Sequence, residues 1–391
     1  MSHMPRTRLP AAIWVLGLVS MLMDISSEMV HALLPLFLVD TLGASVLAVG
    51  VLEGLAESTA LIAKVFSGAL SDRLGSRKGL TVGGYALSAV TKPLFALASG
   101  SGMVLAARLV DRVGKGVRGA PRDALVADLA PPGARGAAFG LRQSLDTTGA
   151  FLGPLVAVVL MLHWRGDFRA IFWVSVVPAA LAVALLVIGV REPAREHAPG
   201  SPPPVRLAAL ARLPARYWGV VGVGAVFTLA RFSEAFLVLR AQHAGVRAAL
   251  IPLVMVLMNV TYAATAYPAG RLADRLSRRT LLAWGLLALV GADLILAGAI
   301  DWMAMLPGVV LWGVHMGLTQ GLFAAMVADA APADLRGTAF GVFNLASGVS
   351  LLLASVIAGA LWARWGAPAT FLTGAAFATL ALAGVMGART S

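Results

Sequence analysis

The strongest constraint on this chain is a series of apolar segments, each long enough to cross a lipid bilayer as an α-helix. A membrane-spanning helix needs about 20 mainly apolar residues. Twelve such segments lie near residues 10–38, 45–71, 79–99, 102–130, 135–162, 167–190, 216–241, 246–273, 279–300, 303–330, 335–363 and 367–388. Transmembrane β-strands are only about 10 residues long and alternate at a period of two. We therefore predict an all-α membrane protein with twelve transmembrane helices.

The composition supports this class. Hydrophobic residues make up 59% of the 391 residues and charged residues only 13%, whereas a soluble domain has about 25% charged residues. The net charge of +12 could indicate a nucleic-acid partner, but the basic residues are spread over short loops. We therefore expect a lipid bilayer as partner and no nucleic acid. The chain has no cysteine, which excludes disulfides and thiolate metal ligands, and we expect neither a metal nor a cofactor.

The loop charges predict the orientation. Sixteen Lys and Arg residues fall on one side of the predicted spans and five on the other. Basic loops stay in the cytoplasm, so we expect both termini there, in a bacterial-type inner membrane. A segment rich in Pro and Arg at 191–215 separates the sixth and seventh spans. We predict an N-terminal six-helix bundle at 1–190, a cytoplasmic linker at 191–215 and a C-terminal six-helix bundle at 216–391.

Two sequence repeats relate the halves. The stretch from Gly68 to Lys78, GALSDRLGSRK, matches the stretch from Gly270 to Arg279, GRLADRLSRR. The two aspartates in them, Asp72 and Asp274, are offset by 274 − 72 = 202 residues. Asp128 and Asp329 open a second match, at an offset of 329 − 128 = 201. Internal repeats of this kind are typical of transporters, so we predict two pseudo-symmetric six-helix bundles.

With these motifs the chain resembles the major facilitator superfamily (MFS) over its whole length. The carriers of the resemblance are the loop at Gly68–Lys78, the fourth-helix segment Arg112–Gly116 and the fifth-helix segment Gly149–Pro154. The last segment is similar to a motif of the antiporter-like branch, although Ala157 and Val158 replace its trailing glycine pair. The resemblance implies a transporter that works by alternating access, without enzymatic activity, and we expect a monomer.

Three ionisable residues of the first span are candidates for proton coupling. Asp24, Glu28 and His31 are spaced four and three residues apart, so they share one helix face. A carboxylate removed from water favours its neutral form and can exchange protons during a cycle, and His31 could relay them. The alternative is structural, with one acid pairing with a cation such as Arg112.

The fourth span carries a second stripe, at Asp111, Lys115, Arg118 and Arg122. Ionisable residues at membrane depth usually face a bundle interior or a water-filled path, so we expect this stripe to line the transport route. Arg and Lys can bind an anionic substrate. Candidate substrate-binding residues in both halves are Arg112, Lys115, Arg118, Arg231, Glu234, Gln320 and Asn344.

Other charged residues have gating or structural explanations. The gating candidates are Asp72, Arg73, Arg122, Asp123, Arg142, Asp146, Asp274 and Arg275. In the family that this chain resembles, the acids at Asp72 and Asp274 meet a helix N-terminus of the other half, where the helix dipole favours negative charge. We expect Glu53 to lie in solvent near the outer mouth, and Lys92 to extend its ammonium group to the membrane surface.

These observations predict a secondary active transporter that exports a small molecule in exchange for protons. An importer or exchanger of an organic anion, such as a carboxylate or a phosphate ester, is the alternative within transport. A non-transporting membrane sensor or an enzyme is the alternative of another class, but the sequence carries no nucleotide-binding motif and no HExxH metal pair.

Overall fold

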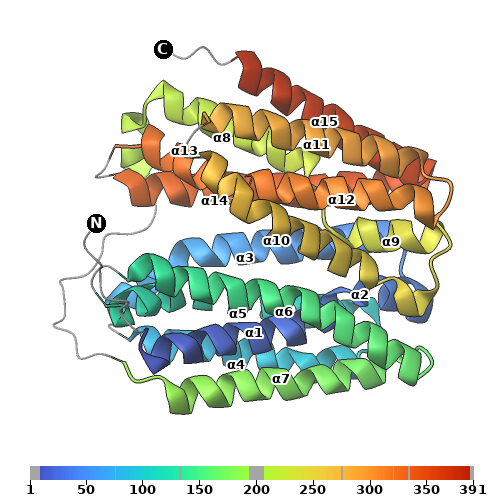
Figure 1. Cartoon of the computed structure of the whole chain (residues 1–391), viewed down its shortest axis with the longest axis horizontal. Coiled ribbons are helices and arrows are strands. Elements are labelled where there is room, and N and C mark those ends of the chain that lie inside the picture. The colour runs from blue at the N-terminus through green and yellow to red at the C-terminus, as the bar shows by residue number, and fades with distance from the viewer. Residues whose placement is uncertain are drawn as a thin grey trace, which may run out of the picture.

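The computed structural model of the chain describes residues 9–74, 76–131, 134–192, 207–273, 276–319, 321–332 and 335–387, and within these ranges it leaves the side chains of residues 68, 69, 72–74 and 207–209 undescribed. These described ranges are built from helices and contain no β-strand (Figure 1). The linker predicted at 191–215 falls largely outside them, since residues 193–206 are not described.

Six spans form the N-terminal bundle. The first is interrupted and consists of α1 (Ala11–His31), the short α2 (Leu34–Leu36) and the π-helical η1 (Phe37–Thr41). The other five are α3 (Val46–Leu74), α4 (Arg77–Leu97), α5 (Ser101–Leu129), α6 (Arg135–His163) and α7 (Phe168–Gly189).

The C-terminal bundle follows a short 3₁₀ segment, η2 (Leu207–Arg212). Its first span is again interrupted, between α8 (Ala215–Ala230) and α9 (Ala235–His243). A 3₁₀ turn, η3 (Ala248–Leu250), leads into α10 (Leu253–Ala273), which is followed by α11 (Arg278–Gly298), α12 (Trp302–Thr319), α13 (Leu322–Ala330), α14 (Arg336–Trp365) and α15 (Ala367–Gly387). Helices α12 and α13 together form one span, bent at Gly321, whose positive φ of 72° is strained for residues with a side chain.

The prediction of twelve spans is confirmed. By length and hydropathy, eleven helical segments of the described chain could cross a membrane. The twelfth is α5, whose 29 residues include eight charged ones. It packs along α3 and α4 (Figure 1) and buries four of those charges, Arg108, Asp111, Arg112 and Arg118. Its low hydropathy therefore reflects a polar interior and not an exposed loop.

The internal repeat is visible as repeated contacts. Arg77 pairs with Asp128 in the first half and Arg278 pairs with Asp329 in the second. The two pairs are offset by 278 − 77 = 201 and 329 − 128 = 201 residues. The same offset relates two helix N-caps: the Ser76 hydroxyl accepts from the Gly79 amide and the Ser277 hydroxyl from the Thr280 amide, both at 3.1 Å. Each such cap satisfies an amide that the helix leaves unpaired.

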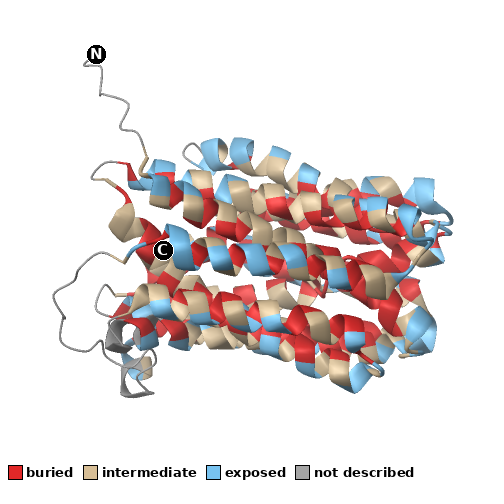
Figure 2. Cartoon of the chain, turned by 90° about the horizontal axis from the view of Figure 1, so that it is seen from below, coloured by how far each residue is buried: buried red, intermediate tan, exposed pale blue. Residues whose placement is uncertain are grey.

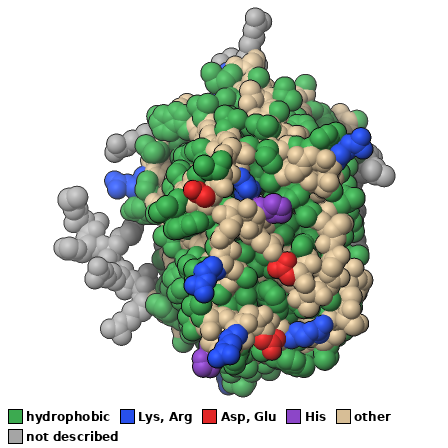
Figure 3. All heavy atoms as spheres, turned by 90° about the vertical axis from the view of Figure 1, so that its right-hand side faces the viewer, with side chains coloured by type: hydrophobic (Ala, Val, Ile, Leu, Met, Phe, Trp, Pro, Cys, Tyr) green, Lys and Arg blue, Asp and Glu red, His purple; other side chains and the backbone are tan. Residues whose placement is uncertain are grey.

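The helices run roughly parallel, so the molecule has two ends. We call the end where α1 begins and α15 ends the terminal end, and the opposite one the distal end (Figure 1). Buried residues lie on the inward-facing sides of the helices, and exposed residues cover the outside and the ends (Figure 2). Figure 3 looks onto the distal end, where charged side chains are scattered among apolar ones.

Packing between the bundles is tightest towards the distal end. There α3 crosses α14 so closely that a Cβ atom on Gly50 would lie 2.4 Å from the carbonyl oxygen of Ser355. Nearby, the amide of Gln242 donates to both carboxylate oxygens of Asp40, at 2.8 and 2.9 Å. These contacts join the two halves, and they close the distal side of the interface.

Candidate functional site

A cavity of about 410 Å³ lies between the two bundles, and we call it the central cavity. Helices α1, α3, α5 and α6 line it from the first half, and α8, α10, α12, α14 and the break before α9 line it from the second. A second space of about 470 Å³, the mouth cavity, continues from it towards the terminal end. The two share the lining residues Glu28, Glu57, Leu61, Lys115 and Ala150. Exposed side chains such as Lys64 and Gln143 border the mouth cavity, so the route opens towards the terminal end.

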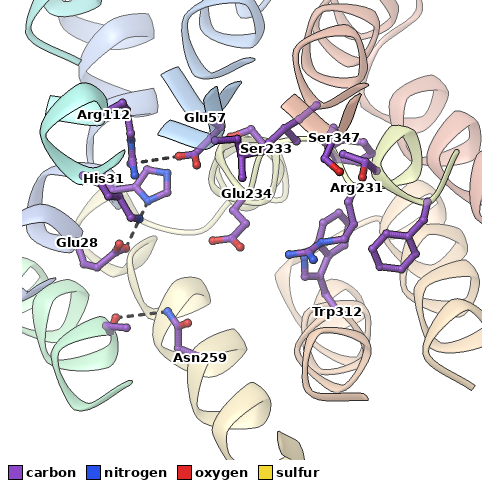
Figure 4. Close-up of a pocket in the computed structure, with 17 residues that line it drawn as sticks. Glu28, His31, Glu57, Arg112, Arg231, Ser233, Glu234, Asn259, Trp312 and Ser347 are labelled. Atoms are coloured by element: carbon purple, nitrogen blue, oxygen red, sulfur yellow. Dashed lines mark hydrogen bonds and ion pairs between the residues drawn. The ribbon is translucent and has the colours of Figure 1, made fainter. Parts of the chain in front are cut away.

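His31 joins two carboxylates at the inner wall of the central cavity. Its Nδ1 lies 3.4 Å from a Glu28 carboxylate oxygen, and its Nε2 lies 3.6 Å from a Glu53 carboxylate oxygen. His31 stands three positions after Glu28 on α1, so the helix itself brings the side chains of Glu28 and His31 together (Figure 4). The imidazole therefore connects a carboxylate in the cavity to one behind its wall.

Two arginines extend this network. The Arg108 guanidinium lies 3.0 Å from Glu53 and 3.8 Å from Glu57, and that of Arg112 lies 3.2 Å from Glu57. Arg108 and Arg112 are four residues apart on α5 and so project from one face. Arg112 thus pairs with an acid of α3 (Figure 4) and not with an acid of the first span.

Two sequence-based expectations about charged residues are wrong. Glu53 is fully buried and paired with Arg108, so it is not a solvated residue of the outer mouth. Lys92 is 1% exposed and donates to Asp111 and Ser27, both at 3.1 Å, instead of extending to the membrane surface. Both corrections have one cause: α5 supplies the buried counter-charges, which the sequences of α3 and α4 alone do not reveal.

Asp24 lines the mouth cavity, and no described residue pairs with its carboxylate or hydrogen-bonds to it. Two glycines of α6 let this part of α1 approach closely. A Cβ atom on Gly149 would lie 2.9 Å from the Asp24 Cβ, and one on Gly153 would lie 2.7 Å from the Glu28 Cβ. The glycines of the fifth-helix motif therefore pack against the part of α1 that carries Asp24 and Glu28.

The charged residues of the α5 stripe do not all lie in the same surroundings: three line the cavities and one packs against α4. Lys115 lines both cavities and has no partner among the described residues. Arg118 and Arg122 line the mouth cavity only. Arg118 donates to the Ser88 hydroxyl at 2.6 Å and lies over the Tyr85 ring. Asp111 is absent from the cavity lining and pairs with Lys92, so the expectation that all four residues line the route is wrong for Asp111.

Four of the gating candidates form one cluster at the terminal end of the first half. Arg142 pairs with Asp146, which also lies 4.0 Å from Arg122, and Asp123 lies 3.2 Å from Arg122. All four residues belong to α5 and α6, so in this conformation the cluster ties helices within one bundle. The side chains of Asp72 and Arg73, and the whole of Asp274 and Arg275, lie outside what the structure describes.

The second half contributes fewer charges. Arg231 and Glu234 stand in the irregular segment between α8 and α9 and line the central cavity, as does Asn259, which donates to the Ala150 carbonyl at 3.4 Å (Figure 4). Asn344 lies on α14 but is not part of the lining of either cavity, where Ser347 is found instead. Gln320 lies outside the described residues.

Several lining residues were not singled out from the sequence. They are Phe227, Phe232, Trp312, Tyr262 and Ser347, all from the second half. The ring centroids of Phe232 and Trp312 are 5.4 Å apart, and those of Phe227 and Phe323 are 4.8 Å apart. Aromatic residues are common on lipid-facing and core surfaces alike, and so their type carries no signal of a site. Only the position of Ser347 gave a signal in the sequence: it stands three residues after the substrate-binding candidate Asn344 and so shares a helix face with it.

The geometry defines a class of protein. Two six-helix bundles enclose a cavity lined by charged and aromatic side chains at mid-depth of the spans, which is the arrangement of a membrane transporter. The comparisons with known proteins agree. The family pattern described as "Major Facilitator Superfamily" matches residues 16–240 and 220–389, and the chain belongs to this family of transporters, which are not enzymes.

One archaeal and one mycobacterial relative match nearly the whole chain, and a third relative matches part of it. An uncharacterized MFS-type transporter of Methanocaldococcus jannaschii is 32% identical over 375 residues, which is 94% of this chain and 92% of the relative. An uncharacterized protein of Mycobacterium tuberculosis is 30% identical, over 90% of this chain and 87% of the relative. The multidrug resistance protein MdtH of Edwardsiella ictaluri is 31% identical over 40% of this chain and 38% of its own.

Solved structures share the fold. A bacterial homologue of the human lysosomal transporter Spinster, in an inward-facing and occupied conformation, superposes with a TM-score of 0.76 at 16% identity, over 96% of this chain and 95% of that chain. A transporter of the POT family in complex with a thioalcohol-conjugated peptide gives 0.80 at 12% identity, over 97% of both chains. At these identities the likeness concerns the arrangement of the helices alone.

Proposed function

We propose that this chain is a proton-coupled exporter, and the observation that carries the proposal is the carboxylate of Asp24. It lines the mouth cavity in the middle of a membrane span and has no partner among the described residues. Ionisable residues in such places are costly, and proton relays are one of the functions that retain them. An unpaired carboxylate in reach of the open end is a group that can take up and release a proton.

The neighbours of Asp24 provide a way to switch its protonation. Lys115 lines the same cavity and is unpaired. When its ammonium group turns towards Asp24, the charged form of the acid is favoured and the proton leaves; when the ammonium group turns away, for example to an anionic group of the substrate, burial favours the neutral form. Glu28 and His31, which touch each other at 3.4 Å, would carry the proton between Asp24 and the distal side.

The orientation belongs to the same proposal. The terminal end carries most of the loop arginines and lysines, so we place it in the cytoplasm, with an inner membrane of bacterial type around the spans. In this orientation the cavity is open to the cytoplasm. We further propose that the chain works as a monomer in which residues 1–190 and 216–391 are the moving halves.

Two features support export. The glycine motif of α6, which is similar to that of antiporters, packs against the backbone that carries Asp24 and Glu28. The stretch that matches MdtH, named as a multidrug resistance protein, covers 40% of the chain. Three members of the gating cluster, Arg122, Asp123 and Asp146, line the mouth cavity, where the cluster would exchange partners with the second half when the mouth closes.

Transport into proteoliposomes tests the proposal. An imposed pH gradient should drive the accumulation of substrate inside vesicles that contain the wild-type protein. Asp24→Asn should abolish this gradient-driven accumulation, while exchange of substrate across the membrane continues. Asp301→Asn is the matched control, because this exposed acid caps α12 far from the cavity through the Ala304 amide, and it should transport like the wild type. If the transport rate of the wild-type protein did not depend on the pH gradient, proton coupling would be refuted.

A second candidate is an exchanger of organic anions, which is favoured by the unpaired cations Lys115 and Arg231 in the central cavity. Such an exchanger would be driven by a counter-gradient of a second anion, and uptake would not depend on Asp24. The same vesicles, loaded with anion at equal pH inside and outside, distinguish the two.

A further inference from the structure

The charges of the central cavity fall into two groups. Four of them form pairs within the first half: Glu28 with His31 at 3.4 Å, and Glu57 with Arg112 at 3.2 Å. The others have no hydrogen-bond or ion-pair partner in the described part of the chain, and they are Lys115, Arg231 and Glu234. Two cations and one acid are therefore left for something that enters the cavity.

Arg231 and Glu234 do not form an ion pair with each other, although they are three residues apart in sequence. The break between α8 and α9 separates them, since residues 231–233 are not helical, and no ion pair joins the two side chains among the described residues. Glu234 instead projects into the open space between the Glu28–His31 pair and the side of the cavity where Trp312 stands (Figure 4). Opposite charges held apart in a cavity can each bind a separate group of one ligand.

The wall beside these charges is aromatic. Phe227, Phe232 and Trp312 line the cavity, and the buried indole nitrogen of Trp312 has no acceptor in the described residues. Buried donors normally find a partner, but Trp312 is 0% exposed, so a ligand would reach this nitrogen only after the ring moves. The ring faces offer an apolar surface, and a cavity of about 410 Å³ is within the range of small-molecule sites, roughly 300–1,000 Å³.

From this arrangement we infer that the transported molecule is amphoteric, carrying an anionic group for Lys115 and Arg231, a protonated amine for Glu234, and an apolar or aromatic body against Trp312. The inference rests on the proposed function only in so far as the cavity is a transport site. It differs from both a purely cationic drug and a purely anionic metabolite. Because Lys115 belongs to the first half and Arg231 and Glu234 to the second, such a molecule would link the two bundles.

Matched ligands test the inference. We would take three aromatic amino-carboxylates of different size, each in three forms: the free zwitterion, the methyl ester, which keeps only the amine charge, and the N-acetyl derivative, which keeps only the carboxylate. Thermal unfolding of the detergent-purified protein gives their relative affinity, because a ligand that binds the folded state raises the midpoint. In each series the zwitterion should bind on the order of tenfold to hundredfold more tightly than either derivative, which lacks one charge-assisted contact.

Variants then assign each charge to its group. Glu234→Gln should weaken the zwitterion and the ester but leave the N-acetyl form unchanged, and Lys115→Met should weaken the zwitterion and the N-acetyl form but leave the ester unchanged. The unchanged ligand shows in each case that the variant is folded. Lys64→Met is the matched control, because this lysine borders the mouth cavity and not the central one, and it should bind all three forms like the wild type.

Two outcomes would overturn the inference: esters or N-acetyl derivatives that bind as tightly as the zwitterions in every series, or no member of any series that shifts the midpoint. Both are independent of proton coupling, since binding is measured without a gradient. If the protein bound the zwitterions but its transport did not depend on pH, this inference would stand and the proposed proton coupling would be refuted.

Discussion

The helix crossing at Gly50 can be tested with one added carbon atom. A Cβ atom there would lie 2.4 Å from the Ser355 carbonyl oxygen, 3.2 Å from the Gly359 Cα and 3.2 Å from the Phe236 ring. Two of these three atoms belong to the backbone of α14, which cannot turn aside as a side chain can. We therefore predict that Gly50→Ala pushes α3 away from α14 and opens the distal end of the interface.

The size of the effect follows from the packing. An extra methyl group in a well-packed contact costs about 1–3 kcal/mol. The cost applies only to the conformation in which α3 and α14 touch at this point, and only such a difference between states shifts their populations. A shift of about 1–3 kcal/mol changes the ratio of the two conformations roughly 5- to 150-fold. The state open at the distal end should become clearly populated, even if it is rare in the wild type.

Distances between spin labels measure this shift. The chain has no cysteine, so pairs of single cysteines can be introduced directly. One pair, at Thr41 and Arg247, reports on the distal end, and another, at Gly136 and Gly337, reports on the terminal end; all four residues are exposed. In Gly50→Ala the distal distance should lengthen and the terminal distance should shorten.

Gly348→Ala is the matched control for this experiment. Gly348 lies on the same α3–α14 interface, but a Cβ atom there would meet its nearest neighbour, the Ser58 carbonyl oxygen, at an ordinary 3.5 Å. Its distances should match those of the wild type. Unchanged distances in Gly50→Ala, or an equal shift in Gly348→Ala, would refute the idea that the crossing holds the distal end closed.

Three further predictions concern other contacts. Gly153→Ala should impair transport driven by a pH gradient, because the added carbon would lie 2.7 Å from the Glu28 Cβ and displace α1, whereas Gly140→Ala on the same helix meets open space and should transport normally in the same vesicles. Lys92→Met should lower the free energy of unfolding by about 3–5 kcal/mol, since it leaves the buried Asp111 carboxylate without its counter-ion. The double variant Lys92→Met/Asp111→Leu should recover most of this lost stability in a thermal-unfolding assay. If it recovered none, the broken ion pair would not be the cause of the loss. Gln242→Ala removes an exposed hydrogen bond to Asp40 and should lengthen the distal distance less than Gly50→Ala does, because a typical hydrogen bond contributes only about 0.5–1.5 kcal/mol net. If Gln242→Ala lengthened this distance more than Gly50→Ala did, the polar contact would be the main closure.

The fold could be predicted from the sequence because its signals are local or repeated. A span shows itself as an apolar stretch whichever neighbour it packs against, and the offset of 201 or 202 residues between matching motifs implies two similar bundles. The helix face that holds Glu28 and His31 was likewise predictable, since side chains three residues apart meet on any α-helix.

Partners on different helices were not predictable in the same way. The stripe on α5 identified Asp111 as interior, but spacing along one helix does not indicate whether the cavity or α4 lies beside a given residue, and Lys92 turned out to be its counter-ion. His31 contacts Glu53 for a similar reason: the two residues stand on separate helices that only the packing brings together. The aromatic wall around Trp312 was missed because apolar residues look alike in lipid, in the core and at a cavity.

The interrupted first span of each half has a mechanical consequence. In the first half the helix gives way at residues 32 and 33, and in the second it gives way at 231–233, an equivalent depth at the offset of 201. An unbroken helix tilts as one rod, so its two ends move in opposite directions. An interrupted helix can bend its distal segment towards the cavity while the other segment keeps its tilt. The distal side of the cavity can then close over the substrate before the two bundles rotate against each other. A transporter that is never open on both sides of the membrane at once does not leak ions.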